Sequence, residues 1–249
     1  MKTSLVITLF LLGTFFTSCD VLLKTANSVL ESNVPLTKSE ISQGLKQALS
    51  VSVDTAVYRL HRKDGYFLDP IVKLGLPPET NEVIEYARRV PGLDKKIDEF
   101  ILQVNRSAED AALKAAPIFK NAILSMSIDD VYTILNGPDN AATSYLNQKT
   151  HAQLARLYQP VLQESLKKPF VAGVSADQTW NEITTQWNKF ATSLAGKLLE
   201  VKPINVELDE YLTNKALDGL FIKVADQEKE IRTNVNARVT DLLRRVFEK

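Results

Sequence analysis

The stretch IDEFILQVNRSAEDAALKAAPIFKNAILSM, residues 97–126, carries the longest unbroken helical pattern in the chain and decides its fold. At about 100° per residue, its apolar side chains fall in one stripe, which is typical of a buried helix face. The stripe consists of Ile97, Ile101, Val104, Ala108, Ala111, Ala115, Phe119, Ala122 and Met126. We therefore expect residues 94–126 to form the central helix of an all-α, single multi-helix bundle.

Three further features of this stretch predict how it packs. Leu102, Leu113 and Leu124 form a second apolar seam on nearly the opposite side, so we expect neighbouring helices on two sides. The many alanines remove bulk and allow neighbouring backbones to approach closely. Pro117 lacks an N–H and its ring crowds the carbonyl of Leu113, which predicts a kink in one continuous helix.

Polar residues interrupt the apolar pattern of the central stretch. Asn105 and Glu109 lie one turn apart at the edge of the main stripe, and Arg106 projects into the second seam. Arg106 can reach Glu109 at i+3 or Asp110 at i+4. Two interpretations follow: a structural ion pair between packed helices, or a polar site in a helical cleft.

The composition bounds the class of protein. The chain has 249 residues, of which 45% are hydrophobic and 24% charged, and these are ordinary values for a globular protein. Thirty basic and thirty acidic residues balance, so no basic excess predicts a nucleic-acid partner. Few glycines and many helix formers favour an all-α fold.

The N-terminal residues read as an export signal over residues 1–18. Lys2 supplies a positive start, and residues 5–16 form an apolar core that is too short to span a bilayer as an ordinary helix. The segment ends in Phe16-Thr17-Ser18-Cys19, and small residues directly before a cysteine resemble the lipobox of bacterial lipoproteins. This predicts cleavage before Cys19 and acylation of its thiol. The alternative is a cleaved secretory signal followed by an incidental cysteine.

The predicted organisation after cleavage is a lipid-anchored tether over residues 19–36 and a helical domain over residues 37–249. The predicted location is the cell envelope, on a periplasm-facing membrane leaflet, with the membrane as a partner through the N-terminal lipid. Cys19 is the only cysteine, so an internal disulfide is excluded.

Caps and breakers divide the helical domain. Thr37 begins a helix that ends at Asp64-Gly65, where we expect Gly65 in the left-handed conformation. The apolar stripe of this helix consists of Ile41, Leu45, Leu49, Val53, Ala56, Val57 and Leu60. Residues 66–76 form an extended crossing. Further helices are expected over residues 79–90, 127–136, 139–147, 150–166, 180–194, from 208 onward, and 237–247, with a loop over residues 167–177. Thr150 is the expected cap of its helix, and Pro160 the expected bend. Trp180, Ile183, Trp187, Phe190 and Leu194 form an aromatic face that we expect in the core.

Catalytic signatures such as GxSxG, HExxH and phosphate-binding glycine loops do not occur in the sequence. His61 and His151 lie far apart and neither has an acid at metal-ligand spacing, so neither a metal site nor a cofactor is predicted. The carboxylates that could act in pairs are Glu109, Asp129, Asp130, Asp139, Asp209, Asp218 and Glu228.

Asp218-Gly219 is unusual because glycine inside a helix costs about 1 kcal/mol relative to alanine. Close packing against the alanine-rich central helix explains it most simply. The alternative is a close approach of the backbone to a ligand, which would add Asp218 to the candidate polar site of Asn105, Arg106 and Glu109.

Several short motifs occur together along the chain. They are Asp64-Gly65-Tyr66; Asn105-Arg106 with Glu109; Ile134-Leu135-Asn136-Gly137 followed by Ala141-Ala142-Thr143 and Tyr145-Leu146; Tyr211 with Lys215-Ala216-Leu217-Asp218-Gly219-Leu220-Phe221; Glu230-Ile231-Arg232; and Leu242-Leu243 before Val246-Phe247. In these motifs the chain resembles the bacterial family catalogued as domain of unknown function 4197. The resemblance implies a helical envelope protein, and it brings no activity and no catalytic residues.

Two hypotheses of function remain. The first is a non-catalytic, lipid-anchored domain that binds an unknown protein or apolar ligand. The second is an envelope hydrolase that uses a carboxylate pair, with Arg106 stabilising charge. The hydrolase requires Asn105, Arg106 and Glu109 to face a cleft together with acids from residues 209–228.

Overall fold

The computed structural model describes residues 35–89, 91–171 and 173–247. Residues 38–249 form one compact unit, and it is described by itself. The predicted signal peptide, Cys19 and nearly all of the predicted tether lie outside the described residues, so those expectations stay predictions.

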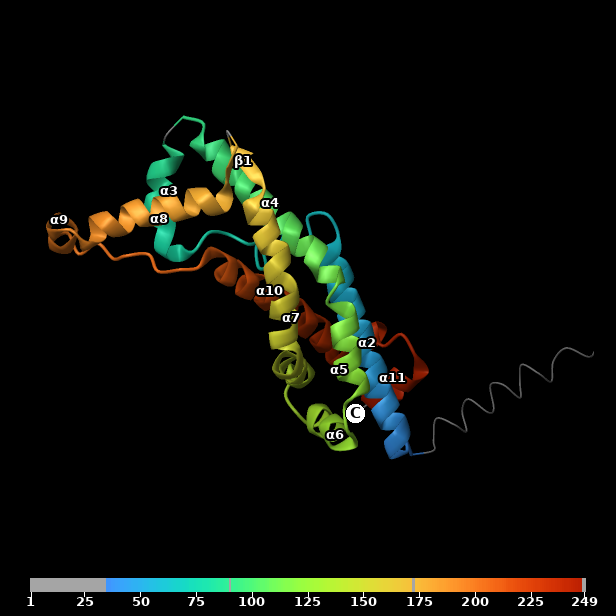
Figure 1. Cartoon of the computed structure of the whole chain (residues 1–249). Coiled ribbons are helices and arrows are strands. Elements are labelled where there is room, and N and C mark those ends of the chain that lie inside the picture. Colours follow the sequence, from blue (N-terminus) through green and yellow to red (C-terminus); the bar gives the residue numbers. More distant parts are fainter. Residues whose placement is uncertain (1–34, 90, 172, 248–249) are drawn as a thin grey trace, which may run out of the picture. The chain divides into compact units, whose positions relative to one another are not determined.

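The described unit is all-α, as predicted, with one small two-stranded hairpin (Figure 1). Its elements, in chain order, are α2 (Lys38–His61), η1 (Pro78–Thr80), α3 (Asn81–Arg88), α4 (Leu93–Leu113), α5 (Ala116–Leu124), α6 (Ile128–Leu135), α7 (Ala141–Lys167), β1 (Pro169–Val171), β2 (Val174–Ser175), α8 (Ala176–Thr192), α9 (Leu194–Leu198), α10 (Leu208–Thr233), η2 (Val235–Ala237) and α11 (Asp241–Phe247).

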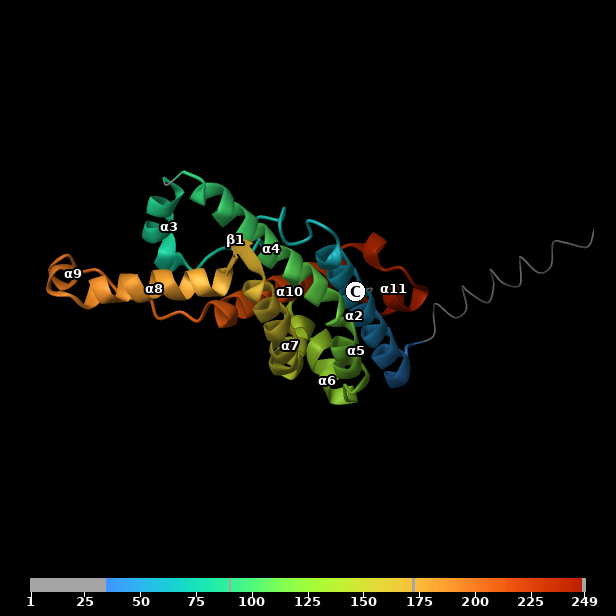
Figure 2. The same cartoon turned by 45° about the horizontal axis from the view of Figure 1, so that its top comes forward.

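The core lies where α2, α4, α5, α7 and α10 meet (Figure 2). α2 packs against α4, α5 and α10, and α7 packs against the same three helices. The predicted stripe of α2 is buried from Leu45 to Leu60, as a helix with neighbours along its apolar face requires. α11 closes the other side of α2, where Leu243 packs with Ala48 and Ile231 in a small second cluster.

The central stretch is two helices and not one kinked helix. α4 ends at Leu113, a turn follows at Lys114 and Ala115, and α5 begins at Ala116. Pro117 lies in the first turn of α5, where a missing N–H leaves no hydrogen bond unmade. Ending α4 at Leu113 therefore removes the clash that a continuous helix would have to absorb.

The main stripe of this stretch is buried from Val104 through Met126, except that Ala122 is only half-buried. The predicted second seam is wrong. Leu113 is 53% exposed and Leu124 is 62% exposed, and only Leu102 of the three leucines is half-buried, so the seam does not face a neighbouring helix along its length. The alanines nevertheless act as predicted, since Ala108, Ala111 and Ala112 are fully buried between α2 and α7.

Residues 141–167 form one helix, although two helices, over 139–147 and 150–166, were predicted. Thr150 lies inside α7, and its hydroxyl donates a hydrogen bond to the carbonyl of Leu146 at 2.6 Å. A side chain that bonds back to its own helix does not cap a new one. Pro160 also lies within α7, on its exposed side, and the helix continues past it.

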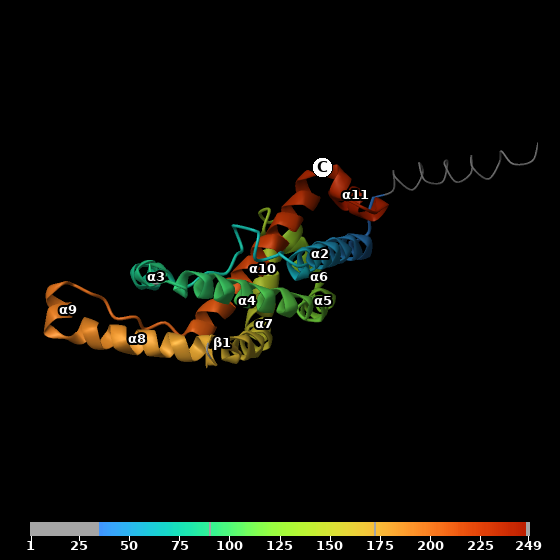
Figure 3. The same cartoon turned by 90° about the horizontal axis from the view of Figure 1, so that it is seen from above.

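The predicted loop over residues 167–177 contains the hairpin of β1 and β2, which pair antiparallel. α8 follows, and α9 lies at the end of α8 that is far from α7 (Figures 1 and 3). The predicted aromatic face of α8 is only partly in the core. Trp180 is buried, whereas Phe190 is 43% exposed and Leu194 is 79% exposed, because α8 reaches beyond the helices that could cover them.

No helix in the described ranges combines the length and the apolar character that crossing a membrane requires.

Candidate functional site

The polar residues of α4 face the segment that links α2 to η1, which we call the crossing segment (residues 62–77). This segment turns sharply at its start. Asp64 has the left-handed backbone conformation, with φ of 70°, and Gly65 does not, contrary to the prediction. Gly65 is needed for a different reason, because a Cβ there would collide with the carbonyl oxygens of Arg59 and Leu60.

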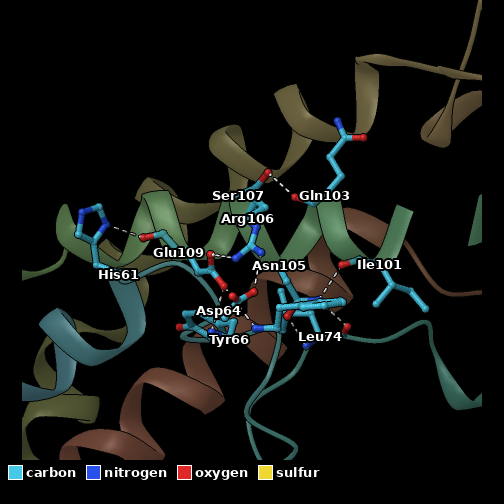
Figure 4. A network of polar contacts seen from close by, with 11 residues as sticks. His61, Asp64, Tyr66, Leu74, Ile101, Gln103, Asn105, Arg106, Ser107 and Glu109 are labelled. Carbon is cyan, nitrogen blue, oxygen red and sulfur yellow. Dashed lines mark hydrogen bonds and ion pairs between the residues drawn. The ribbon is translucent and has the colours of Figure 1, made fainter. Parts of the chain in front are cut away.

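Asn105 is fully buried and pairs with both backbone groups of Leu74 (Figure 4). Its Oδ1 accepts the N–H of Leu74 at 2.9 Å, and its Nδ2 donates to the carbonyl of Leu74 at 2.9 Å. Nδ2 also donates to the carbonyl of Ile101 at 2.7 Å. The side-chain amide therefore does for the crossing segment what a neighbouring strand does in a sheet.

Glu109 holds the other end of the crossing segment. Its side chain is buried, and its Oε1 accepts the N–H groups of Tyr66 at 3.2 Å and of Phe67 at 3.3 Å. Its Oε2 accepts a hydrogen bond from Arg106 at 2.6 Å. The backbone carbonyl of Glu109 lies 3.0 Å from Nδ1 of His61, at the end of α2. One residue of α4 thus contacts α2 and the crossing segment together.

Arg106 links two carboxylates rather than facing a substrate. Its guanidinium donates to Glu109 and, at 2.5 Å, to Asp64 at the turn. Hydrogen bonds to Glu109 and Asp64 raise the pKa of Arg106, so it stays cationic. Asp110, the other partner that helical spacing allowed, is exposed. The structural interpretation of these polar residues thus accounts for each of their contacts.

Tyr66 continues the network into α10. It is fully buried, and its hydroxyl donates to the carbonyl of Ala216 at 2.8 Å. Burial raises the pKa of Tyr66 well above its ordinary value, and the neighbouring Tyr158 and Glu109 raise it further. Burial also raises the pKa of Tyr158.

Gly219 makes room for the crossing segment. A Cβ at Gly219 would lie 3.0 Å from Cε1 of Tyr66 and 3.0 Å from Cβ of Val72. The expectation that this glycine packs against the central helix therefore named the wrong neighbour. Close packing still explains the glycine, and two side chains of the protein itself fill the space that a ligand would have needed.

Asp218 lies apart from the other three candidate residues. Its side chain is exposed, 59%, and pairs with Lys215 at 3.4 Å. Asp209 accepts hydrogen bonds from Gln159 and Gln163. Asp209 and Asp218 thus lie in different surroundings from Glu109. Asp226 lines a hollow together with Asp64, but Asn105, Arg106 and Glu109 do not line it, whereas the hydrolase hypothesis requires these residues to face one cleft with the acids.

A second buried carboxylate, Glu228, holds the start of α7. Its Oε1 accepts the N–H of Ala142 at 3.0 Å, and its Oε2 accepts both the N–H and the hydroxyl of Thr143 at 2.8 Å. Arg232 pairs with Glu228 at 2.9 Å and also donates to the carbonyl of Ile134. The sequence placed Glu228 only among possible paired acids. The spacing of Glu228 and Arg232 by four residues was the one signal of an ion pair.

The described surface is hollowed beside α2 and α10. One hollow of about 490 Å³ includes Asp64 and Lys223, and an adjoining hollow of about 660 Å³ includes Ile231 and Val239. Both are lined in part by Arg59 and Asp226, and we call them together the α2–α10 groove. Lys223 pairs with Asp69 there at 2.7 Å. The groove is open and carries both signs of charge, which suits a protein surface better than a small apolar ligand.

In the described part of the chain, no three His, Cys, Asp or Glu side chains lie close enough together to bind a metal ion.

Comparison with known proteins gives a family and no activity. No curated protein and no solved structure matches the chain. A family model described as protein of unknown function (DUF4197) matches residues 35–248, a range that includes all of the described residues. The polar residues of α4, the Asp64-Gly65-Tyr66 turn and the Gly219 contact all lie inside the matched region. The chain therefore belongs to the DUF4197 family.

Proposed function

We propose that the protein is a lipid-anchored component of the bacterial cell envelope whose helical domain binds a partner protein and catalyses no reaction. The non-catalytic part of this proposal is supported by one observation: the polar side chains of α4 are already engaged in hydrogen bonds within the protein. Asn105 and Glu109 are buried, and their hydrogen bonds go to the backbone of the crossing segment. A carboxylate spent on structural bonds in this way is unfit to act as a general acid or base, which must reach a substrate.

The sequence supports the anchor. A positive residue, an apolar stretch of twelve residues over 5–16 and small residues before Cys19 together match what a lipoprotein signal requires. Acylation of Cys19 would explain why an exported chain carries a single cysteine. Two or three acyl chains hold a protein stably on a membrane, whereas one holds it only marginally.

The α2–α10 groove is the surface that supports partner binding. Part of the groove is formed by α2 and α10, whose other faces are fixed in the core, and part by residues 65–70 of the crossing segment. Glu109 holds this segment by hydrogen bonds, so the groove is preformed. Lys223 pairs there with Asp69 and Asp226, and Arg59 lines the same hollow. These charges favour specificity for a partner of matching charge.

The anchor is tested by changing Cys19→Ala in the full-length chain. The mature wild-type protein should carry the mass of attached lipid and fractionate with membranes, and the variant should lose the lipid mass and leave the membrane fraction. The proposed lipid anchor would be refuted if the wild-type protein carried no lipid mass and the variant still fractionated with membranes.

The binding role is tested at the groove by introducing a photo-crosslinking residue at Gln227, which lines it, in living cells. Crosslinks to one protein should form there and weaken when Arg59→Glu reverses a groove charge. The matched control places the same residue at Lys120, which is exposed on α5. Crosslinking of equal yield and identity at both positions would contradict a specific groove.

A further inference from the structure

The end of α8 and the helix α9 expose a cluster of large apolar side chains. Phe190 is 43% exposed, Leu194 79%, Leu198 77% and Leu199 69%. We call these four residues the apolar tip. Single exposed apolar residues are ordinary, but four within ten consecutive positions form a patch of the kind that marks an interaction site.

The backbone of the apolar tip is held firmly. The return segment, residues 200–207, runs back along α8, where Asn188 exchanges two hydrogen bonds with Ile204, at 2.7 and 2.8 Å. Trp187 donates to the carbonyl of Lys202 at 2.9 Å. Gly196 is buried, and a Cβ there would collide with the backbone of Phe190 and Ala191. The fold therefore fixes a tight bend that keeps its leucines outward.

The charges around the apolar tip are mainly positive. Lys189, Lys197 and Lys202 are exposed, and Glu200 is the one acid within residues 189–203. Lysine has a long apolar stem with a charged end, so it can lie beside inserted apolar residues while its ammonium reaches lipid phosphates. Leucine and phenylalanine flanked by lysine are the composition of segments that bind membrane interfaces.

We propose that the apolar tip inserts into the interface of a membrane that contains anionic lipid. α9 lies at the end of α8 that reaches away from the other helices (Figure 3), and Leu194 and Leu198 of α9, with Leu199 directly after it, are exposed there. Such a shape enters a lipid surface more readily than it fits a flat protein. The proposal rests on the envelope location proposed above and adds a second membrane contact, made by the folded domain. It orients the domain instead of leaving it free on its tether.

The test uses the fluorescence of Trp187, whose ring centroid lies 6.4 Å from that of Phe190. The chain has two tryptophans, so Trp180→Phe leaves the emission of Trp187 alone. The full chain carries Cys19→Ala and is tethered by a C-terminal hexahistidine tag to vesicles that contain nickel-chelating lipid, so the result does not depend on acylation. Lipids with brominated acyl chains quench only a tryptophan that reaches them.

We expect quenching of Trp187 on vesicles rich in phosphatidylglycerol and its loss when Leu194, Leu198 and Leu199 are all changed to Ser. In a second variant, Lys189, Lys197 and Lys202 are all changed to Gln. On phosphatidylglycerol vesicles, quenching of Trp187 in this variant should fall to the weaker level that the unchanged tip shows on phosphatidylcholine vesicles. The matched control changes Leu113 and Leu124, which are exposed elsewhere, to Ser and should keep full quenching.

Unquenched Trp187 on anionic vesicles would overturn the proposal and favour a protein partner for the apolar tip. Quenching that survives the loss of the three leucines would overturn it as well. Equal quenching on both lipid compositions would overturn the role of the lysines. The lipid mass attached to Cys19 is measured in a separate experiment. Failure of the proposed anchor would therefore appear in the mass, and failure of the proposed insertion of the apolar tip would appear in the quenching.

Discussion

Individual side chains on α4 stabilise the crossing segment, a stretch of backbone that forms turns but neither a helix nor a strand. Asn105 and Glu109 bond the N–H groups of Tyr66, Phe67 and Leu74 and the carbonyl of Leu74. Each of these groups, left buried without a partner, would cost about 1–3 kcal/mol. The polar residues that interrupt the apolar stripe of α4 thus allow the crossing segment to be buried.

At the turn that begins this segment, Gly65→Ala should lower the free energy of unfolding by about 1–3 kcal/mol, since the added Cβ meets backbone carbonyls that cannot swing aside. Urea unfolding followed by circular dichroism measures the change. The control is Gly75→Ala in the same segment, where nothing lies within 4 Å of the added atom. Gly75→Ala should be neutral or stabilise by about 0.4–1 kcal/mol. Equal losses in both variants would refute the steric explanation.

At the scale of elements, the starts of α6 and α7 differ in whether the cap comes from neighbouring residues or from a distant part of the chain. Ser127 and Asp130 form the capping box of α6, where sequence predicted a helix start, and the backbone N–H and hydroxyl of Ser127 lower the pKa of Asp130. Asn140, at the start of α7, makes no side-chain cap, and Glu228 from α10 supplies it instead. A cap from more than eighty residues away leaves no local trace. The division of α7 into two predicted helices had a different cause, because Thr150 was predicted to be a local cap.

Removing this distant cap should weaken the whole domain. Glu228→Ala should lower the free energy of unfolding by about 3 kcal/mol, because it leaves Arg232 half-buried without its carboxylate and two N–H groups of α7 without an acceptor. Asp226→Ala, two residues away and exposed, should change stability by less than about 0.5 kcal/mol. Chemical unfolding of both variants measures these changes. A decrease in the free energy of unfolding of less than about 1 kcal/mol for Glu228→Ala would contradict the role of Glu228 as a cap.

Sequence periodicity correctly predicted features that depend on residues close together in the chain, such as which face of a helix is apolar. The buried stripe of α2 from Leu45 to Leu60 and the alanine face of α4 were predicted correctly. Periodicity also predicted burial of Leu124 and Phe190, which are exposed, because an apolar pattern says which face could be covered and not whether a partner exists. Spacing along the helix allowed Arg106 to pair with Glu109 or with Asp110, and Glu109 is the partner. Its second partner, Asp64, belongs to another segment that spacing cannot reveal.

At the scale of the whole molecule, the core joins its parts through Tyr66. The ring fills the space left by Gly219, its hydroxyl bonds to α10, and Tyr158 of α7 lies beside it. Burial raises the pKa of both tyrosines, so the folded state favours their neutral forms. Their folded pKa values exceed the unfolded value near 10.0. The stability that they contribute is therefore complete below that pH and is lost as the pH rises beyond it.

Alkaline titration should consequently show Tyr66 and Tyr158 ionising only as the helices unfold. Tyrosinate absorbance and circular dichroism, recorded together, measure the two events. Tyr158→Phe should reduce the absorbance change that accompanies unfolding. Ionisation of every tyrosine before any loss of helix would contradict the buried pair.

The central claim is that the polar residues of α4 hold the crossing segment in place through hydrogen bonds to its backbone. Hydrogen exchange at the amide of Leu74 tests it most directly, because Oδ1 of Asn105 is the acceptor of that amide. The claim predicts that this amide exchanges as slowly as core helix amides, and that Asn105→Leu makes it exchange at least about tenfold faster while Ser107→Ala does not. Fast exchange in the wild-type protein, or no change in Asn105→Leu, would contradict the claim.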